Sequence, residues 1–128
     1  MKRYCTTFAL LFAVLPTPSL GDTVSGSAGN ITLAANAEAG LAVVRTLGTV
    51  NGQALACSEK DVAGRARQLM LAHAPKTQRF GAAYEEATQE AFTAQTRSGK
   101  PCADATEFTA RLNQLALQLS ETLPVAAK

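Results

Sequence analysis

The apolar positions of residues 58–123 recur every three or four residues in three separate segments. This spacing places them on one face of an α-helix. The three stripes are Val62, Ala66, Leu69, Met70 and His73; Phe80, Ala83, Tyr84, Ala87, Ala91 and Ala94; and Phe108, Leu112, Leu115, Ala116 and Leu119. The pattern predicts three amphipathic helices, each with one face toward a common core.

The boundaries between these stripes carry residues that end helices. Pro75 closes the first segment and is also tolerated in the first turn of the next. Gly99 and Pro101 close the second segment, and Pro124 closes the third. The connections are therefore short, and short connections join helices that run antiparallel to one another.

Two helix starts are suggested by pairs of capping residues. Ser58 is followed three residues later by Asp61, and Asp104 by Glu107. In a capping box the first side chain accepts a hydrogen bond from the backbone N–H three residues on. We therefore expect helices to begin at Ser58 and at Asp104.

Residues 31–56 show a mixed pattern. The apolar and small residues with helical spacing are Ala34, Ala37, Leu41, Val44 and Gly48. Asn51-Gly52, in contrast, is a hairpin-turn signal between apolar runs. Few β-branched or aromatic residues surround it, which favours a helix and leaves a hairpin as the alternative. A kink or break near Gly48–Gly52 is expected either way. In a helix, Gly48, Gly52 and Ala56 would let a neighbouring helix approach closely.

The first 21 residues have the order of a secretory signal peptide. Lys2 and Arg3 precede an apolar run, Cys5–Leu15, which is too short for a stable membrane span. A helix-breaking stretch with small residues then leads to a cleavage site after Gly21. We interpret residues 1–21 as a signal peptide, with a short N-terminal membrane anchor as the alternative, and expect a periplasmic or secreted protein.

The remaining chain divides into two parts by composition. Residues 22–33 are rich in Gly and Ser, so we expect a flexible N-terminal segment there. Residues 34–128 are expected to form the helical domain. The fold class that follows is all-α: a small antiparallel bundle of three to four helices.

Charge and composition narrow the possible partners. Lys2 and Arg3 are the only charged residues of the signal peptide, so ten basic and ten acidic residues remain after cleavage. A net charge of zero removes the electrostatic argument for nucleic acid or an anionic membrane. The chain has no tryptophan, and its apolar residues are mostly Ala, Leu and Val. This composition suits closely packed helices better than a large aromatic pocket.

Two cysteines, Cys57 and Cys102, remain after cleavage. In an up-down-up arrangement they begin the first and third predicted helices, at the same end of the bundle. The second helix is longer than the first by about 10 Å. The link between Ser98 and Pro101 spans about 13 Å when extended, which closes that difference. We therefore predict an interhelical Cys57–Cys102 disulfide, as an exported chain favours. A reactive thiol or redox pair is the alternative.

The sequence offers little material for catalysis or metal binding. His73 is the only histidine, on an apolar stripe near a helix end, where a satisfied boundary residue is the ordinary reading and a pH-responsive group or ligand the alternative. Glu85, Glu86 and Glu90 have the spacing of an exposed, solubilising helix face rather than of a catalytic pair. We expect no enzyme, no cofactor and no metal site.

One charged cluster is a candidate partner-binding site. Its members are Arg65, Arg67, Lys76 and Arg79, around the turn at Pro75. Such a cluster would suit an acidic partner protein, and a solvated helix face is the alternative.

In plan, the cysteine-linked helices from Cys57 to Leu123 resemble the small periplasmic acid-stress chaperones. That resemblance implies a chaperone or stress-response role, without transferring any site residue. Three functions are therefore considered. The first is non-enzymatic binding of another protein, as an accessory, inhibitor or immunity protein. The second is a periplasmic chaperone, and the third a carrier of a small ligand or metal. The sequence leaves the oligomeric state open.

Overall fold

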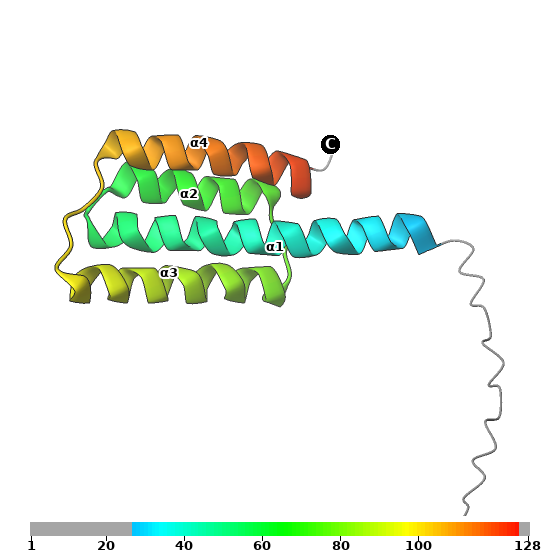
Figure 1. Ribbon diagram of the computed structural model, residues 1–128, viewed down its shortest axis with the longest axis horizontal. Coiled ribbons are helices and arrows are strands. Elements are labelled where there is room, and N and C mark those ends of the chain that lie inside the picture. The colour runs from blue at the N-terminus through cyan, green and yellow to red at the C-terminus, as the bar shows by residue number, and fades with distance from the viewer. Residues whose placement is uncertain (1–26, 126–128) are drawn as a thin grey trace, which may run out of the picture.

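The protein is a bundle of four antiparallel helices (Figure 1). A computed structural model describes residues 27–125, with side chains from residue 32. The helices are α1 (Ser27–Ala56), α2 (Lys60–His73), α3 (Gln78–Ser98) and α4 (Ala105–Thr122). They run alternately in opposite directions, and α1 lies between α2 and α3. No strand occurs within residues 27–125. The predicted all-α antiparallel bundle is confirmed. The predicted signal peptide, residues 1–21, lies outside the described residues.

Helix α1 settles the mixed pattern of residues 31–56. It is one helix of 30 residues, so the hairpin alternative is excluded. The expected kink or break near Gly48–Gly52 is wrong, because no interruption occurs there and the helix is drawn straight in Figure 1. The helix also begins at Ser27, so residues 27–33 of the segment expected to be flexible are helical.

Two different faces of α1 hold the bundle together. One face carries Val44, Leu47, Val50 and Ala54, which are nearly or fully buried in the core that α2 and α4 share. Leu41, seven residues before Gly48, is also buried. The stripe of α4, namely Phe108, Leu112, Leu115 and Leu119, is buried in the same core. Burying large aliphatic and aromatic side chains in this way is the main favourable term in the folding of the bundle.

The other face of α1 is built from glycine and packs against α3. A Cβ atom built on Gly48 would lie 2.5 Å from the carbonyl oxygen of Tyr84. One built on Gly52 would lie 2.1 Å from the carbonyl oxygen of Thr88 and 2.8 Å from the nitrogen of Phe92. The backbones therefore approach at a distance that only glycine permits. The expectation that this row allows close approach is confirmed, and the approach explains glycine inside a continuous helix.

Ser58 ends α1 instead of capping α2, so this capping prediction is wrong. Its φ of 62° is left-handed, its N–H bonds to the carbonyl of Leu55, and the N–H of Glu59 bonds to Ala54. This is the hydrogen-bond pattern of a Schellman motif. Helix α2 then begins at Lys60 with no side-chain cap. Because α1 continues to Ala56, the backbone N–H groups of Ser58 and Glu59 bond to its last carbonyls, and the serine belongs to the end of that helix.

The other helix boundaries follow local rules. Asp104 caps α4 by accepting from the N–H of Glu107 at 2.8 Å, as predicted. Gly99 ends α3 in the left-handed conformation, with a φ of 63°. The α3 start uses Thr77, whose hydroxyl accepts from the N–H of Phe80; the sequence reading did not identify this cap.

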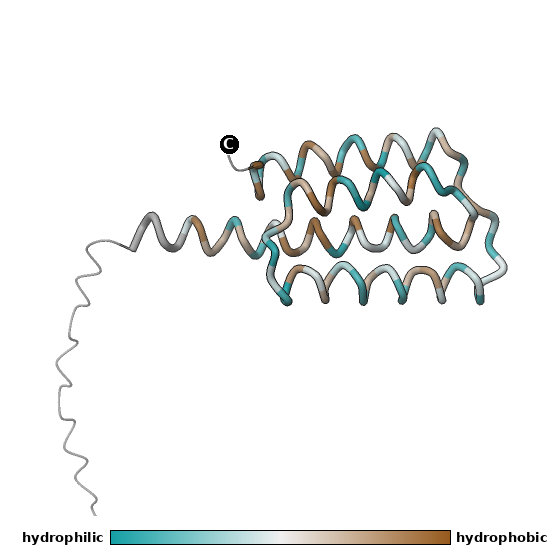
Figure 2. Tube along the Cα trace, turned by 180° about the vertical axis from the view of Figure 1, so that it is seen from behind, coloured by the Kyte–Doolittle hydropathy of each residue, from teal (hydrophilic) through white to brown (hydrophobic). Residues whose placement is uncertain are grey.

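The bundle closes at one end around Leu123, and α1 projects beyond it. A Cβ on Gly40 would meet the side chain of Leu123 at 2.4 Å, so this leucine lies directly on α1. Its carbonyl oxygen lies 2.9 Å from His73 Nδ1. The next residues of α1 toward the N-terminus are mostly exposed, including Leu33. Figure 2 shows the projecting helix, and apolar residues along the buried part of α1.

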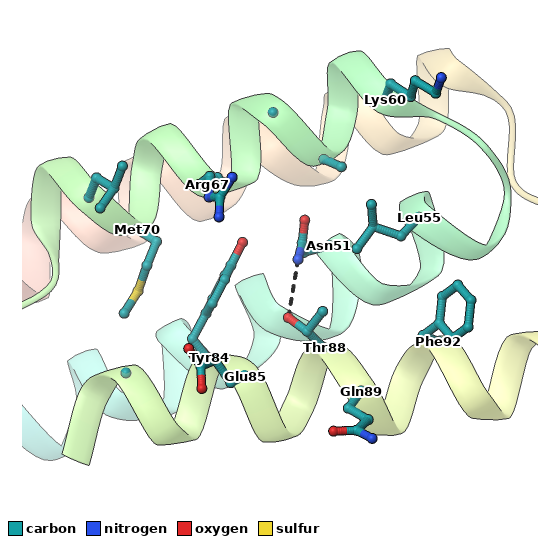
Figure 3. Close-up of a pocket in the computed structure, with 14 residues that line it drawn as sticks. Asn51, Leu55, Lys60, Arg67, Met70, Tyr84, Glu85, Thr88, Gln89 and Phe92 are labelled. Carbon is teal, nitrogen blue, oxygen red and sulfur yellow. Dashed lines mark hydrogen bonds between the residues drawn. The ribbon is translucent and has the colours of Figure 1, made fainter. Parts of the chain in front are cut away.

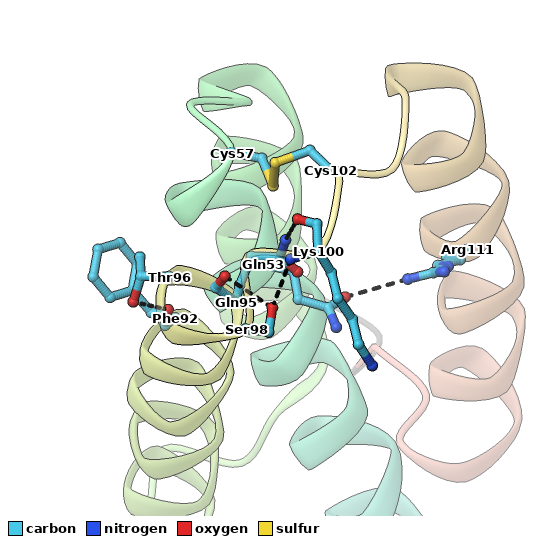
Figure 4. The surroundings of a disulfide bond; sticks show 9 residues. All are labelled: Gln53, Cys57, Phe92, Gln95, Thr96, Ser98, Lys100, Cys102 and Arg111. Atoms are coloured by element: carbon cyan, nitrogen blue, oxygen red, sulfur yellow. Dashed lines mark hydrogen bonds between the residues drawn. A yellow bond between two sulfur atoms is a disulfide. The ribbon is translucent and has the colours of Figure 1, made fainter.

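A disulfide joins Cys57 and Cys102 at the opposite end of the bundle (Figure 4). Their Cα atoms are 5.8 Å apart, across the end of α1 and the loop before α4. The loop is held on its other side, where Gln95 Nε2 donates to the carbonyl of Lys100 at 3.0 Å. The predicted disulfide is present, and the free-thiol alternative does not apply to these two residues.

We expect Gly52→Ala to lower the free energy of unfolding by about 1 to 3 kcal/mol, because the added methyl group has no space against α3. Urea denaturation at low protein concentration measures the effect. Gly64→Ala is the control: a Cβ there meets nothing within 4 Å, and alanine should stabilise α2 by about 0.5 to 1 kcal/mol. Equal effects at the two positions would contradict the close packing of α1 on α3.

Replacing both Cys57 and Cys102 by serine should lower the free energy of unfolding by about 4 kcal/mol, since the bond closes a loop with a sequence separation of 45. Chemical denaturation with and without a reducing agent tests this. The reductant should destabilise the native chain and leave the double variant unchanged. An unfolding midpoint indifferent to reduction would show that the bond does not support the fold.

Candidate functional site

A groove separates α2 from α3, with α1 as its floor (Figure 3). Its volume is about 780 Å³. Within the described bundle, α2 packs on α1 and α4, and α3 packs on α1, while α2 and α3 scarcely touch. Asn51 and Leu55 of α1 lie at the bottom of this α2–α3 groove. The groove therefore results from packing both helices on α1 at different depths.

Large apolar side chains are concentrated in the α2–α3 groove. Leu55, Leu71 and Phe92 line it and are 46%, 60% and 42% exposed. They are three of the six large hydrophobic residues exposed among those described. Clustered exposed apolar side chains, in contrast to scattered ones, mark surfaces that bind something.

A glycine stands on each wall of the groove. Gly64 of α2 and Gly81 of α3 line it, and a Cβ at either position would meet open space. Each costs its helix about 0.5 to 1 kcal/mol relative to alanine. Contacts within the chain explain Gly48 and Gly52 but not these two. The missing side chains widen the groove and leave room for another backbone.

Two polar side chains lie among these apolar ones. Asn51, 8% exposed on the floor, donates from Nδ2 to the hydroxyl of Thr88 at 3.2 Å. The hydroxyl of Tyr84 is buried and has no hydrogen-bond partner among residues 27–125. The sequence reading did not identify either residue as a site. In the sequence pattern, Tyr84 lies on the apolar stripe of its helix and Asn51 is part of a hairpin-turn signal, so neither is marked as a polar site residue.

Tyr84 and Arg67 approach each other across the groove. Figure 3 shows the ring of Tyr84 reaching from α3 toward Arg67 on α2. Burial raises the pKa of Tyr84 to about 12, because the phenolate would lose its hydration, and the positive charge of Arg67 opposes this rise. Tyr84 is therefore a neutral hydrogen-bond donor throughout the physiological range.

The basic cluster predicted around Pro75 does not form one patch. Arg65 bonds to Asn113 of α4, and Arg79 forms an exposed ion pair with Glu38 of α1. Lys76 donates to the carbonyl of Leu71 at 3.1 Å. Of the four predicted partner-binding residues, the groove includes only Arg67. Helical geometry separates Arg65 from Arg67, because residues two apart point to different sides of a helix.

Other potential sites contribute little in the part of the chain that the structure describes. His73 is half-buried, and its Nδ1 donates to the carbonyl of Leu123. This matches the reading of a satisfied boundary residue. No group of three or more His, Cys, Asp or Glu residues among those described is placed to hold a metal ion. Within residues 27–125, none of the helices is long and apolar enough to cross a membrane.

Comparisons of the chain with family models, with curated proteins and with solved structures find no match.

We expect Tyr84 to ionise near pH 12 in the folded protein and near pH 10 in urea. The folded state favours the neutral phenol, so the free energy of unfolding should fall as the pH rises from 10 to 12. Absorbance near 295 nm measures this directly on a chain beginning at Asp22, where Tyr84 is the sole tyrosine. A folded-state midpoint near pH 10 would place the ring in water and contradict its burial.

Proposed function

We propose that this chain is an exported, non-enzymatic protein that acts by binding a helix of a partner protein in the α2–α3 groove. The concentration of Leu55, Leu71 and Phe92 in one groove carries the proposal. Export is proposed from the signal-peptide pattern of residues 1–21 and is supported by the Cys57–Cys102 disulfide, since such bonds persist in oxidising compartments.

The dimensions of the groove favour a helix as its occupant. Along α2 the groove extends from Lys60 to Leu71, about 16 Å, or three turns of a helix. A helix of that length presents apolar residues at positions i, i+3 or i+4, and i+7 to such a surface. Gly64 and Gly81 leave room for its backbone between the walls. The rim is polar, with Lys60 on one side and Glu85 on the other.

A photo-crosslinking amino acid in place of Phe92 should capture the partner in the cell that exports this chain. We expect one major adduct with a different polypeptide, recovered outside the cytoplasm. Gly81→Leu should abolish it by filling the groove without destabilising α3, since leucine forms helices better than glycine. Leu71→Asp should abolish it by placing a charge on the apolar wall.

Matched controls separate groove binding from general adhesion. Leu117 is 68% exposed on α4, away from the groove, so Leu117→Asp should leave the adduct intact, and a crosslinker at position 117 should not produce it. Adducts with many unrelated proteins would instead favour the chaperone alternative. A thermal shift with a small molecule, together with no protein adduct, would favour the carrier. An adduct insensitive to Gly81→Leu would contradict groove binding.

A further inference from the structure

We propose that the helix bound in the α2–α3 groove carries a carboxylate side chain, which binds between Arg67 and Tyr84 with apolar residues on either side. This inference rests on the proposed function and names the chemistry of the partner. It is drawn from an unsatisfied donor, an unpaired cation and the distribution of apolar side chains along the groove.

The donor is the hydroxyl of Tyr84. It is buried, it has no hydrogen-bond partner, and its raised pKa keeps its proton in place. Leaving a buried hydroxyl unbonded is costly, because the group has lost its water and gained nothing in return. Asn51, the neighbouring polar residue of the floor, donates from Nδ2 to Thr88, and no hydrogen bond joins its side chain to the hydroxyl of Tyr84. Among the described residues, no acceptor bonds to this hydroxyl.

The cation is the guanidinium of Arg67. The ion pairs among the described residues join Arg79 to Glu38 and Arg111 to Glu107, so Arg67 has no such partner. Glu85 lies on the opposite wall but is not paired with it. A guanidinium has donors and no acceptor, so it cannot satisfy the proton of Tyr84. A group that binds both residues must accept hydrogen bonds, and a negative charge strengthens its bonds to the exposed guanidinium, as in a carboxylate.

Apolar side chains lie on both sides of the Arg67–Tyr84 pair along the groove. Figure 3 shows Met70 beyond Tyr84 toward one end of the groove, and Leu55 with Phe92 toward the other. An occupant that contacts all of them presents an apolar residue, then the acidic residue about one turn later, then a second apolar residue about one turn after that. A small inorganic anion would satisfy Arg67 and Tyr84 but would leave the apolar ends uncovered.

Two alanine-based peptides of about 16 residues test the proposal, a length at which such helices become stable. Both carry leucine at positions 5 and 12 and differ only at position 9, which is Glu in one and Gln in the other. Fluorescence anisotropy of the labelled peptides gives the affinity. We expect the Glu peptide to bind at least about tenfold more tightly to the native chain, the usual worth of hydrogen bonds to a charged group. The ultraviolet spectrum of Tyr84 should change on binding of the Glu peptide.

Three variants connect this preference to the two residues. Arg67→Gln should remove the preference for Glu over Gln. Tyr84→Phe should reduce it, because the hydroxyl bonds more strongly to a carboxylate than to a neutral amide. Arg65→Gln removes the same charge from the same helix, on the side that contacts Asn113, and should change nothing. Circular dichroism and the unfolding midpoint confirm that each variant is folded before it is compared.

The outcomes separate this inference from the proposed function. Equal binding of the two peptides, abolished by Gly81→Leu, would overturn the carboxylate inference and leave helix binding in the groove intact. Failure of both peptides to bind at millimolar concentration would overturn the inference. The crosslinking experiment would still judge the proposed function independently. Binding of decanoate at the same residues without binding of the Glu peptide would also overturn it, in favour of a small apolar acid.

Discussion

The close approach of α3 to the glycine face of α1 is the constraint on which the rest of the structure depends. Gly48 and Gly52 let α3 pack against α1 backbone to backbone. Helices α2 and α4 pack on α1 through larger side chains in the hydrophobic core, such as Leu47 and Leu112. Helix α3 lies close to α1, whereas larger side chains separate α2 from α1, so α2 and α3 scarcely touch each other. The α2–α3 groove is the space that remains.

The disulfide adds a covalent link to this packing at one end of the bundle. Cys57 follows α1 directly and Cys102 lies in the loop that leads to α4, so the bond joins the central helix to the last one. A cysteine close to a helix start suggests a reactive thiol when it is considered alone. In the structure Cys57 is bonded to Cys102, so it is not a free thiol.

The groove combines apolar walls with a buried hydroxyl that has no hydrogen-bond partner among the described residues. Stable cores satisfy their buried polar groups, so an orphaned hydroxyl such as that of Tyr84 calls for an explanation. The same applies to Gly64 and Gly81, which weaken their helices without an internal packing reason. Each feature costs the isolated chain stability, and a bound helix would compensate for all of them. This coincidence is the strongest support for a binding function.

The sequence alone determined the elements that depend on neighbouring residues: the amphipathic stripes, the Asp104 cap, the endings at Pro75 and Gly99, and the pairing of two cysteines in a chain of short connections. Tertiary structure decided what depends on distant residues. Gly48 and Gly52 stay inside a straight helix because α3 packs on them, whereas local propensity predicts a break. Ser58 forms the C-terminal cap of α1, and not the start of α2, because α1 extends to Ala56. Periodicity placed Tyr84 on a buried face, but only the gap between α2 and α3 made its hydroxyl part of a site.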